Sequence, residues 1–374
     1  MKLNEISVIT MGQSPKSIYY NKKHLGIPFL QGGTTFGKLY PTYETWTTKW
    51  SKEAIPNDIL FTVRAPVGNL NICTKRTAIG RGIASIRAKT IDYKYLFYVL
   101  SLYSKQIKQV STGSIFGSIN KEELGNIELK INKKIKQSHI VDIIGSIDEQ
   151  INCIDEQIGK LEIINKYLFK YMFFNKFKKA KLKKCPIISN EYVTTINNNV
   201  SLFHKTKMYI ATANVKDTSI NSYDSFVDYH HRPSRANNLP IANSIWFAKM
   251  KSTSKKILVL PRDKYLINNY IFSTGFMGLQ ISRKYLSYFW TFICLKEFED
   301  IKNKMSSGAT QQAIDKTTLG ELNILIPTDS NLFEYFGNHS LPILDKINSL
   351  KEKRNILIKH KKAILPLLIC EQIY

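Results

Sequence analysis

The sequence has few cysteines and histidines, the residues that build many metal and redox sites, and it has no apolar run long enough to span a membrane. It contains 5 cysteines and 7 histidines in 374 residues. The cysteines are far apart, with no CxxC pair, at Cys73, Cys153, Cys185, Cys294 and Cys370. This spacing argues against a zinc site or a disulfide framework and is typical of a reducing compartment. The longest apolar run, residues 286–295, is about half of what a membrane span needs, and the N-terminus has no apolar signal core. We therefore expect a cytoplasmic protein.

Motifs for catalysis are also missing. The chain has no [DNS]PP[YFW] segment of an amino-methyltransferase and no GxxxxGK[ST] loop for a triphosphate. It has no HExxH or GxSxG motif and no carboxylate–lysine cluster of a nuclease. Gly80-Arg81-Gly82 is better explained as a turn between strands than as a cofactor motif. We therefore expect no catalytic residue, no metal and no cofactor in this chain, which would bind and position while another protein does the chemistry.

Carboxylates are scarce relative to cations. The chain has 54 Lys and Arg against 29 Asp and Glu, a formal net charge of +25. An AT-rich genome would enrich lysine without depleting carboxylates, so the excess favours a polyanionic partner, either nucleic acid or, as a lesser alternative, an anionic membrane surface. With 43% hydrophobic residues the chain has enough apolar material for packed cores, and its length suits two domains.

A long internal repeat is the most informative feature of the sequence. Residues 111–131 and 306–326 match at an offset of 195, and the match continues into the following segments at an offset of 196. Upstream, residues 55–61 match 241–247 at an offset of 186, and residues 27–33 match 209–215 more weakly, at an offset of about 183. The period is too long for a solenoid, whose repeats span about 20–50 residues. It predicts two similar domains related by a pseudo-two-fold axis.

The two halves alternate between β-rich and helical composition. Residues 1–133 and 181–328 are rich in β-branched and aromatic residues with Gly and Pro between them, each with one helical segment, 91–110 and 281–301. Each is followed by a long helix, within 134–180 and 329–374, and the basic run 176–184 is expected to be a linker. Pro366 is expected to kink or end the last helix.

Both long helices have the apolar spacing of a coiled coil. The seam of the first helix consists of Ile140, Ile144, Ile147, Ile151, Ile154, Ile158 and Leu161. The seam of the second consists of Ile343, Ile347, Leu350, Leu357 and Ile364, with Arg354 and Lys361 at two further seam positions. These two cations suggest a partly hydrated bundle or one filled by a partner's helices.

The two seams lie at equivalent positions of the internal repeat, and the chain has one of each. We therefore predict that the two helices pair with each other, antiparallel, within one molecule. A dimerisation coiled coil between two chains is the alternative. The first helix would extend roughly 50 Å at 1.5 Å per residue, more than one turn of B-DNA, which is about 34 Å. The helix pair could therefore set a fixed spacing between two contacts on DNA.

These features resemble the specificity subunit of type I restriction–modification enzymes. The resemblance rests on LNEISVITMGQSP (3–15) with IPFLQGG (27–33), on SSGATQQAIDKTTLGELNILIP (306–327), and on the ends of the long helices, NKYLFKYMF (165–173) and HKKAILPLLI (360–369). It covers essentially the whole chain. Residues 115–117 depart from the family pattern, because they read Ile-Phe-Gly where residues 310–312 have Thr-Gln-Gln.

The resemblance implies a DNA-binding protein with an α+β fold, in which residues 1–133 and 181–328 are target recognition domains. Each would recognise one half of a bipartite target in double-stranded DNA, and the helices would set the gap and dock two methyltransferase subunits. Motor–endonuclease subunits would join for restriction. S-adenosylmethionine, ATP and Mg would belong to those partners.

Candidate DNA-binding residues follow from the chemistry of phosphate and base contacts, which needs cations, amides and small polar loops. In the first domain they are Gln31, Thr34, Arg64, Lys75, Arg76 and Arg81, with the loop residues Ser111, Gly113 and Ser114. In the second they are Asn214, Lys216, His231, Arg232, Arg235, Lys249, Lys251 and Lys255, with the loop residues Ser306 and Gly308.

Other functions stay open on the sequence. The same architecture could serve a system whose methyltransferase and nuclease are fused in one partner. The chain could instead be a nuclease or methyltransferase with diverged motifs, or a basic coiled-coil scaffold that binds DNA without sequence preference.

Overall fold

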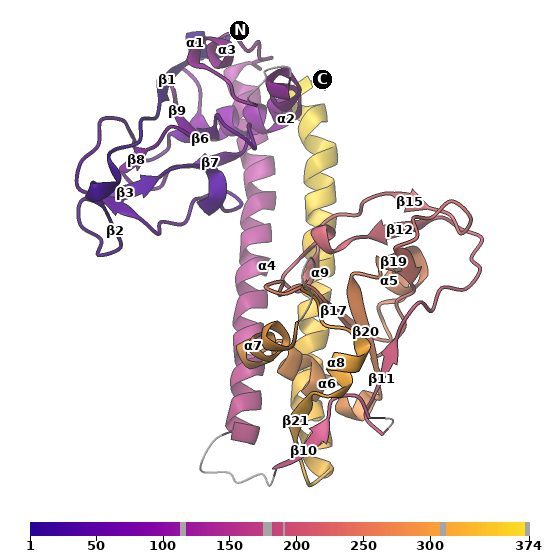
Figure 1. Ribbon diagram of the computed structural model, residues 1–374. Helices are drawn as coiled ribbons and strands as arrows, with labels where there is room; N and C mark the ends of the chain where they lie inside the picture. Colours follow the sequence, from indigo (N-terminus) through magenta and orange to yellow (C-terminus); the bar gives the residue numbers. More distant parts are fainter. Residues whose placement is uncertain (113–116, 175–181, 190, 307–311, 371–374) are drawn as a thin grey trace. The chain divides into compact units, whose positions relative to one another are not determined.

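The computed structural model describes residues 1–112, 117–174, 182–189, 191–306 and 312–370, without the side chains of residues 105–112. The chain divides into two compact units, Met1–Ile151 with Leu357–Tyr374, and Asn152–Ile356. Each unit contains one β-rich domain and a segment of both long helices, α4 (Lys134–Phe174) and α9 (Asn331–Cys370) (Figure 1). The predicted α+β fold with two β-rich domains and two long helices is confirmed.

The first domain contains an antiparallel sheet and a mixed sheet. The antiparallel sheet has the strand order β1 (Ser7–Met11), β9 (Ile83–Ala88), β6 (Ile59–Thr62), β7 (Leu70–Ile72). The mixed sheet has the order β2 (Tyr20–Asn21), β4 (Trp46–Thr47), β3 (Ile27–Leu30), β8 (Thr77–Ile79), β5 (Glu53–Ala54), with β3 and β8 parallel. The helical elements are α1 (Leu3–Ile6), α2 (Tyr93–Thr112), α3 (Lys121–Gly125) and the 3₁₀ turns η1 (Ser17–Tyr19) and η2 (Gly33–Thr35).

The second domain has two sheets of matching order. The antiparallel sheet is β11 (Val193–Ile196), β20 (Phe276–Ile281), β17 (Ser244–Ala248), β18 (Lys256–Val259). The mixed sheet is β15 (Phe226–Val227), β12 (Lys207–Ile210), β19 (Tyr270–Ser273), β16 (Ala236–Asn238), with β12 and β19 parallel. Two short pairs add β10 (Leu182–Pro186) with β21 (Asn323–Pro327) and β13 (Val215–Lys216) with β14 (Ser219–Ile220). Its helical elements are η3 (Thr212–Asn214), α5 (Lys264–Asn269), α6 (Arg283–Ile293), α7 (Lys296–Met305) and α8 (Lys316–Gly320).

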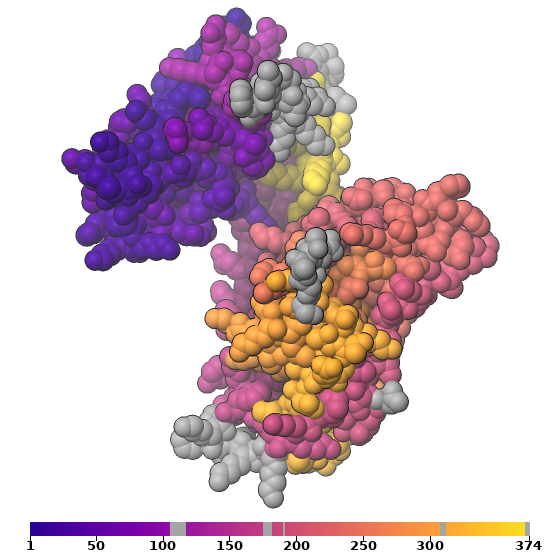
Figure 2. All heavy atoms as spheres, viewed as in Figure 1, coloured from indigo at the N-terminus to yellow at the C-terminus, as the bar shows by residue number. Residues whose placement is uncertain are grey.

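Both domains bury the central strands and the helix that follows them. The central strand β6 is buried along its whole length, as is its counterpart β17, which explains their mostly apolar sequences. In the first domain Phe61 and Leu96 are fully buried in one apolar cluster, and the space-filling view shows this domain as one closely packed body of indigo and violet atoms (Figure 2). Trp246 and Phe272 lie in the corresponding cluster of the second domain.

The internal repeat is confirmed at the level of strand pairing. Ile59 pairs with Ile86, and their counterparts Ile245 and Leu279 pair in the same way. The short helices α3 and α8, 195 residues apart, both begin at an N-cap side chain, Asn120 and Asp315, that accepts a hydrogen bond from the third residue of the helix. The two β-rich domains are therefore two copies of one fold.

The weakest of the four repeat matches has the wrong offset. Leu30 pairs with Ile79 in the first domain, and Ile210 pairs with Phe272 in the second. The equivalent strands β3 and β12 are thus 180 residues apart (30 to 210) rather than about 183. The sequence could not fix this offset because only apolar character is conserved between the two strands.

The two long helices pair antiparallel in each unit. In the first unit, Ile140 and Ile144 of α4 share an apolar cluster with Leu365 and Ile369 of α9. In the second unit, Asn165 of α4 donates a hydrogen bond to Thr291, and its Oδ1 accepts one at 2.6 Å from Ser340 of α9. The predicted intramolecular pairing of the two helices is confirmed.

More of the predicted seam positions are buried in α4 than in α9. Ile140, Ile144, Ile151, Ile154 and Ile158 are buried, while Ile147 and Leu161 are half-buried. In α9, Ile347 and Leu350 are buried, whereas Ile343, Leu357 and Ile364 are only half-buried. Leu344 and Leu365, which follow Ile343 and Ile364 in the sequence, are more deeply buried. An α-helix has 3.6 residues per turn, so its buried face drifts away from a strict 3.5-residue repeat along α9.

The two seam cations of α9 form ion pairs with α4, while the expected partly hydrated or partner-filled bundle stays a prediction. Arg354 donates to Asp155 at 3.1 Å, and its side chain is 10% exposed. Lys361 donates to both oxygens of Asp148. Each cation of α9 therefore has a carboxylate of α4 as its partner.

Two further local expectations are wrong, and a third is wrong in part. Residues 182–184 belong to strand β10 rather than to a linker, while residues 176–181 lie outside the described part of the chain. Helix α9 continues through Pro366 to Cys370, so this proline does not end the helix. The helical segment predicted over 281–301 is two helices, because Leu295 between them has an extended backbone and is buried.

Candidate nucleic-acid interface

Five segments of the first domain meet where strands of its two sheets end. They are residues 12–14, 31–34, 63–69, 80–82 and 117–119. The turn between β8 and β9 is at their centre. Its Gly80 and Gly82 amides donate to Leu30 and Gln31, and the Gly82 carbonyl accepts from Val63 at 3.0 Å.

Glycine makes this close approach possible. A Cβ at Gly82 would lie 2.7 Å from the carbonyl oxygen of Gln31, and a Cβ at Gly12 would lie 2.2 Å from the carbonyl oxygen of Gly80. Side chains are therefore excluded at both positions. The turn predicted for Gly80-Arg81-Gly82 is confirmed, and its glycines pack the neighbouring loops around Arg81.

The loops present four of the predicted residues on their surface. Gln31, Thr34, Arg64 and Arg81 are all exposed. The amide of Arg81 donates to the Ser14 hydroxyl at 3.1 Å, which fixes the backbone and leaves the guanidinium outside. This group can donate to phosphate or base oxygens.

Lys75 and Arg76 belong to a different part of the domain, the turn between β7 and β8. The Lys75 ammonium lies 4.5 Å from the centre of the Tyr43 ring, and Arg76 forms an ion pair with Glu53 at 3.0 Å. The guanidinium of Arg76 is the largest cause that lowers the pKa of the Glu53 carboxyl. The structure therefore does not bring these two cations to the group around Arg81.

The second domain repeats the arrangement with different side chains. Lys249 donates its amide to Gly275 at 3.0 Å and accepts at its carbonyl from Ile314. These bonds correspond to those of Val63 with Gly82 and Ile119 in the first domain. The carbonyl of Arg235 accepts from Thr274 in the same turn. The candidates Arg235, Lys249, Lys251 and Lys255 are thus brought together at the equivalent place.

These four cations differ in exposure. Arg235 and Lys251 are exposed, whereas Lys249 is half-buried and burial lowers its pKa. Lys255 donates to the carbonyl oxygen of Thr212 at 2.8 Å and so ties the β17–β18 loop to η3. Lys251 is therefore the most accessible lysine of this loop.

Two further candidates have local partners. The side chain of Asn214 is buried, with Oδ1 accepting from the Ala211 amide and Nδ2 donating to Ser222. It shapes the η3 loop from within instead of standing on its surface. Lys216 is exposed in the adjoining β13–β14 hairpin.

The loop between β15 and β16 contains the last two candidates of the second domain, His231 and Arg232. The His231 imidazole lies 3.0 Å from the Asp228 carboxylate, and its side chain is 86% exposed. Hydrogen bonds from the backbone and ring of His231 lower the pKa of Asp228. Arg232 stacks over Tyr229, with 4.3 Å between guanidinium and ring centre, and donates to the Tyr229 carbonyl.

The predicted phosphate-facing loops are only partly described. Gly113, Ser114 and Gly308 lie outside the described residues. The backbone of Ser111 is helical, within α2, instead of forming a turn. Ser306 is buried and donates its hydroxyl to the Lys302 carbonyl at 2.8 Å, so its side chain already has a partner in the domain.

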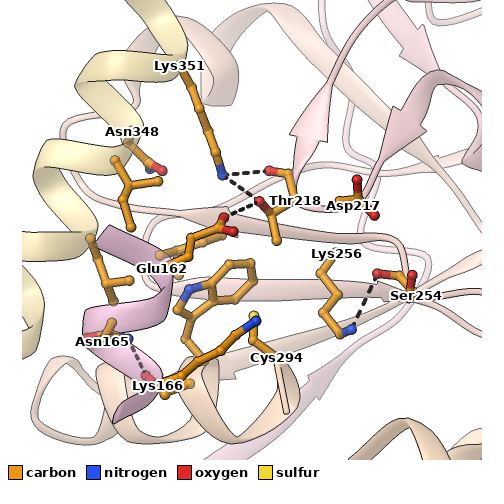
Figure 3. Close-up of a pocket in the computed structure, with 15 residues that line it drawn as sticks. Glu162, Asn165, Lys166, Asp217, Thr218, Ser254, Lys256, Cys294, Asn348 and Lys351 are labelled. Carbon is orange, nitrogen blue, oxygen red and sulfur yellow. Dashed lines mark hydrogen bonds between the residues drawn. The ribbon is translucent and has the colours of Figure 1, made fainter. Parts of the chain in front are cut away.

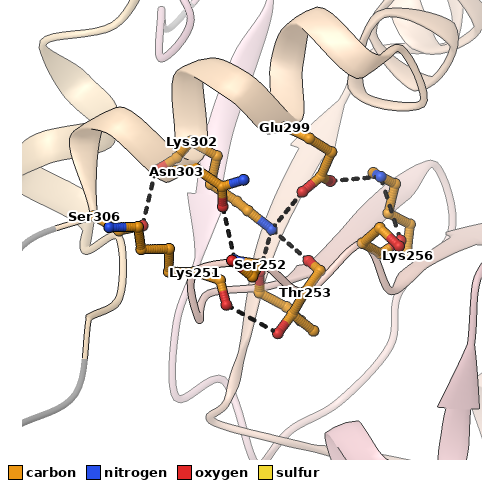
Figure 4. A network of polar contacts seen from close by, with 10 residues as sticks. Lys251, Ser252, Thr253, Lys256, Glu299, Lys302, Asn303 and Ser306 are labelled. Carbon is orange, nitrogen blue, oxygen red and sulfur yellow. Dashed lines mark hydrogen bonds and ion pairs between the residues drawn. The ribbon is translucent and has the colours of Figure 1, made fainter. Parts of the chain in front are cut away.

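A buried polar network behind the β17–β18 loop was not foreseen from the sequence. It consists of Lys302, Glu299 and Asn303 of α7 with Lys256 of β18 (Figure 4). Lys302 is fully buried and lies 2.8 Å from Glu299, which pairs with Lys256 at 2.6 Å. One signal was present in the sequence: Lys302 follows Phe298 by four residues and therefore shares its buried helix face.

A cavity of about 290 Å³ lies in the second unit among α4, α6, α9 and the β13–β14 turn (Figure 3). Lys351 donates to the carbonyl and hydroxyl oxygens of Thr218, whose hydroxyl donates to Glu162 at 2.9 Å. Burial lowers the pKa of Lys351 to about 8 and raises that of the Cys294 thiol to about 11. The cavity thus contains a destabilised ammonium and a thiol that stays protonated at neutral pH.

Within the described part of the chain, no group of three or more His, Cys, Asp or Glu side chains could hold a metal ion. No described helix is long and apolar enough to cross a membrane.

Comparisons with known proteins agree with this architecture. Residues 1–163 match the family described as type I restriction modification DNA specificity domain. This part of the chain is similar to that family. The specificity-domain match includes the loops around Arg81 and most of α4. The resemblance to type I restriction specificity subunits that the sequence suggested is confirmed by this match.

One curated relative is the putative type I restriction enzyme MjaX specificity subunit of Methanocaldococcus jannaschii, 35% identical over 172 residues. The match covers 46% of this chain and 40% of that protein, so the chain spans less than half of the relative's length. The crystal structure of the type I restriction–modification S subunit from M. genitalium superposes with a TM-score of 0.62. It covers 100% of this chain and 96% of that one at 14% identity, which supports the specificity-subunit fold over the full length.

The HsdS subunit from Thermoanaerobacter tengcongensis is a third similar protein. It is 34% identical, covers 40% of this chain and 37% of that chain, and has a TM-score of 0.36.

Proposed function

We propose that this chain is the DNA-specificity subunit of a type I restriction–modification complex, and that each β-rich domain recognises one half of a split DNA sequence. One observation carries the proposal. The two domains have the same strand order in their antiparallel sheets, and in their mixed sheets apart from the additional strand β2. They assemble equivalent turns and loops, with exposed basic side chains such as Arg81 and Lys251. A duplicated basic surface suits a two-part polyanion. The net charge of +25 is in keeping with it.

The helix pair would set the unread gap between the half-sites. Helix α4 has 41 residues, which corresponds to about 60 Å at 1.5 Å per residue. One turn of B-DNA spans about 34 Å. A rod of this length can separate two contacts by more than one turn of DNA.

The helices also offer a surface for methyltransferase subunits. Ile163, Tyr167 and Tyr171 follow one another at intervals of four residues on α4, with exposed fractions of 68%, 72% and 42%. Large apolar side chains in such a stripe are typical of protein–protein contacts. We expect Tyr167→Arg to abolish co-purification with a co-expressed methyltransferase subunit of the same system, and Lys160→Glu on the same helix to have little effect.

The chain itself would be non-catalytic and cytoplasmic. S-adenosylmethionine would bind the methyltransferase subunits, while ATP and Mg would bind the motor–endonuclease subunits. This division of labour agrees with the absence of methyltransferase and P-loop motifs from the sequence.

Single-molecule methylation sequencing tests the proposal. Cells would express the neighbouring methyltransferase with or without this chain. We expect a split motif with a fixed gap that disappears when the chain is omitted. A methylated motif that persists without the chain would overturn the proposal.

Binding of the purified chain to DNA separates the alternatives. Salt-sensitive binding without sequence preference would indicate a scaffold. Methylation or cleavage of DNA by the chain alone would indicate an enzyme. A partner that combines both activities in one polypeptide would indicate the related system with a fused methyltransferase–nuclease.

A further inference from the structure

The loops β6–β7 and β17–β18 have the same length, and each is anchored to its own domain in the same way. Residues 63–69 and 249–255 each connect strands paired in the same register, with Phe61 opposite Leu70 and Phe247 opposite Lys256. The residue before each loop donates its amide to the last loop residue, Thr62 to Asn69 and Ala248 to Lys255. The two loops are therefore direct counterparts, although their sequences, VRAPVGN and KMKSTSK, share no residue at any equivalent position.

The first loop is supported from within. The Thr62 hydroxyl donates to the Pro66 carbonyl at 2.7 Å and accepts from the Asn69 amide at 2.8 Å. Thr62 is buried, and Val67 at the centre of the loop belongs to the apolar core. One hydroxyl thus fixes two points of the loop that presents the exposed Arg64.

The second loop has no hydroxyl at this position, because Ala248 is the counterpart of Thr62. Its support comes from helix α7. The Lys302 ammonium donates to the carbonyl oxygens of Ala248, at 3.3 Å, and of Thr253 (Figure 4). Asn303 accepts at 2.8 Å from the amide of Ser252, a residue with a left-handed backbone, φ 58°.

Burial makes the lysine an unusual support. Lys302 is fully buried, and its charge is compensated by Glu299 at 2.8 Å. A buried ammonium is tolerated only when its protons have partners. Here the partners of the Lys302 ammonium include the backbone carbonyls of Ala248 and Thr253, at the two ends of the loop segment 248–253. The ammonium can keep both hydrogen bonds only when the loop adopts this conformation.

We propose that Lys302 is a positioning residue for DNA recognition by the second domain, and that Thr62 has the same role in the first. The inference rests on the proposed function, because it assumes that the two loops contact DNA. Lys302 holds the loop from Ala248 to Thr253 so that Lys251 projects toward the DNA. Thr62 does the same for Arg64. The sequence preference of each half-site thus depends on a buried residue that does not touch DNA.

The test uses the full chain and a pool of DNA duplexes with randomised sequence. Bound duplexes are sequenced to obtain the preference at each half-site for wild type, Lys302→Met and Thr62→Val. We expect Lys302→Met to relax the preference of one half-site by about tenfold and to leave the other unchanged. Thr62→Val should relax the other half-site. General destabilisation would weaken both together. Lys304→Met, an exposed lysine of the same helix, controls for the lost charge.

A second variant covers the case in which Lys302→Met fails to fold. Asn303→Ala removes the hydrogen bond to the loop without leaving a buried charge. We expect it to relax the same half-site as Lys302→Met, to a smaller extent. Hydrogen exchange of residues 249–255 in the DNA-free chain should become faster in both variants.

The outcomes separate this inference from the function on which it rests. A wild-type chain with no sequence preference would overturn the proposed function and the inference together. A selective wild type whose Lys302→Met and Asn303→Ala variants keep both half-site preferences would overturn the inference alone. Relaxation of both half-sites by Lys302→Met would also contradict it.

Discussion

Lys361 of α9 forms an ion pair with Asp148 of α4, with its ammonium nitrogen 2.6 Å from Oδ1 and 2.7 Å from Oδ2. The Tyr98 hydroxyl donates to the same carboxylate at 3.0 Å. One aspartate thus connects both long helices to helix α2 of the first domain. Burial is the largest cause that raises the pKa of Tyr98, and the negative charge of Asp148 raises it further.

Asp148→Ala should destabilise the first unit. The change leaves the Lys361 ammonium and the Tyr98 hydroxyl without their acceptor in a site where the side chain of Lys361 is only 22% exposed. We expect a loss of about 1–3 kcal/mol in the free energy of unfolding, measured by urea denaturation. Asp142→Ala, an exposed aspartate on the same helix, should change it by less than about 0.5 kcal/mol. Equal effects of the two variants would show that the ion pair contributes nothing.

The stability of the second unit should depend on pH through Lys351. Burial lowers the pKa of Lys351 in the folded chain to about 8, while the unfolded chain keeps the ordinary value near 10.4. Below about pH 8 both states bind the proton, and the charged form disfavours folding. Between the two pKa values the unfolded state binds more protons, so the stability contributed by this group rises with pH.

Comparison with Lys351→Met isolates this effect. From about pH 7.5 to about pH 9.5 the stability of wild type should increase relative to the variant by about 1–2 kcal/mol. Lys353→Met, at an exposed position of the same helix, controls for the loss of a charge. If the difference in stability between wild type and Lys351→Met stays constant or falls as the pH rises, the lowered pKa of Lys351 is contradicted.

Two glycine-to-alanine substitutions should have opposite effects on stability. A Cβ at Gly12 would lie 2.2 Å from the Gly80 carbonyl oxygen, whereas a Cβ at Gly159 in α4 meets nothing within 4 Å. We expect Gly12→Ala to destabilise the chain by about 1–3 kcal/mol, because backbone must move. Gly159→Ala should stabilise it by about 0.5–1 kcal/mol through helix propensity. Thermal unfolding of both variants checks the signs, and a stable Gly12→Ala variant would refute the close approach of the loops.

The proposed spacer role of the helices predicts that a longer helix lengthens the gap of the DNA target. Four residues inserted in register into α4 would lengthen it by about 6 Å, which is close to two base pairs of B-DNA at about 3.4 Å each. Methylation sequencing should then find the same half-sites with a longer gap. Altered half-sites with an unchanged gap would show that the helix does not set the spacing.

The sequence by itself determined the duplication, the approximate bounds of the long helices and the absence of catalytic motifs. These properties are local or periodic. A long helix predicted within residues 134–180 is observed as Lys134–Phe174, because helical spacing follows from side chains a few residues apart. The turn at Arg81 was predicted for a similar reason, since the glycines on both sides of it indicate a turn between strands.

Only the tertiary structure decided which side chains are used inside the protein. Lys302 and Lys251 are both lysines in a basic chain, yet one is fully buried and the other is exposed. Asn214, a candidate for contact with DNA, is occupied within its own loop. Burial and pairing depend on groups that are distant in sequence, such as Ala248 with Lys302 or Asp148 with Lys361. The chain order alone does not contain these distances, because packing of the strands and helices creates them.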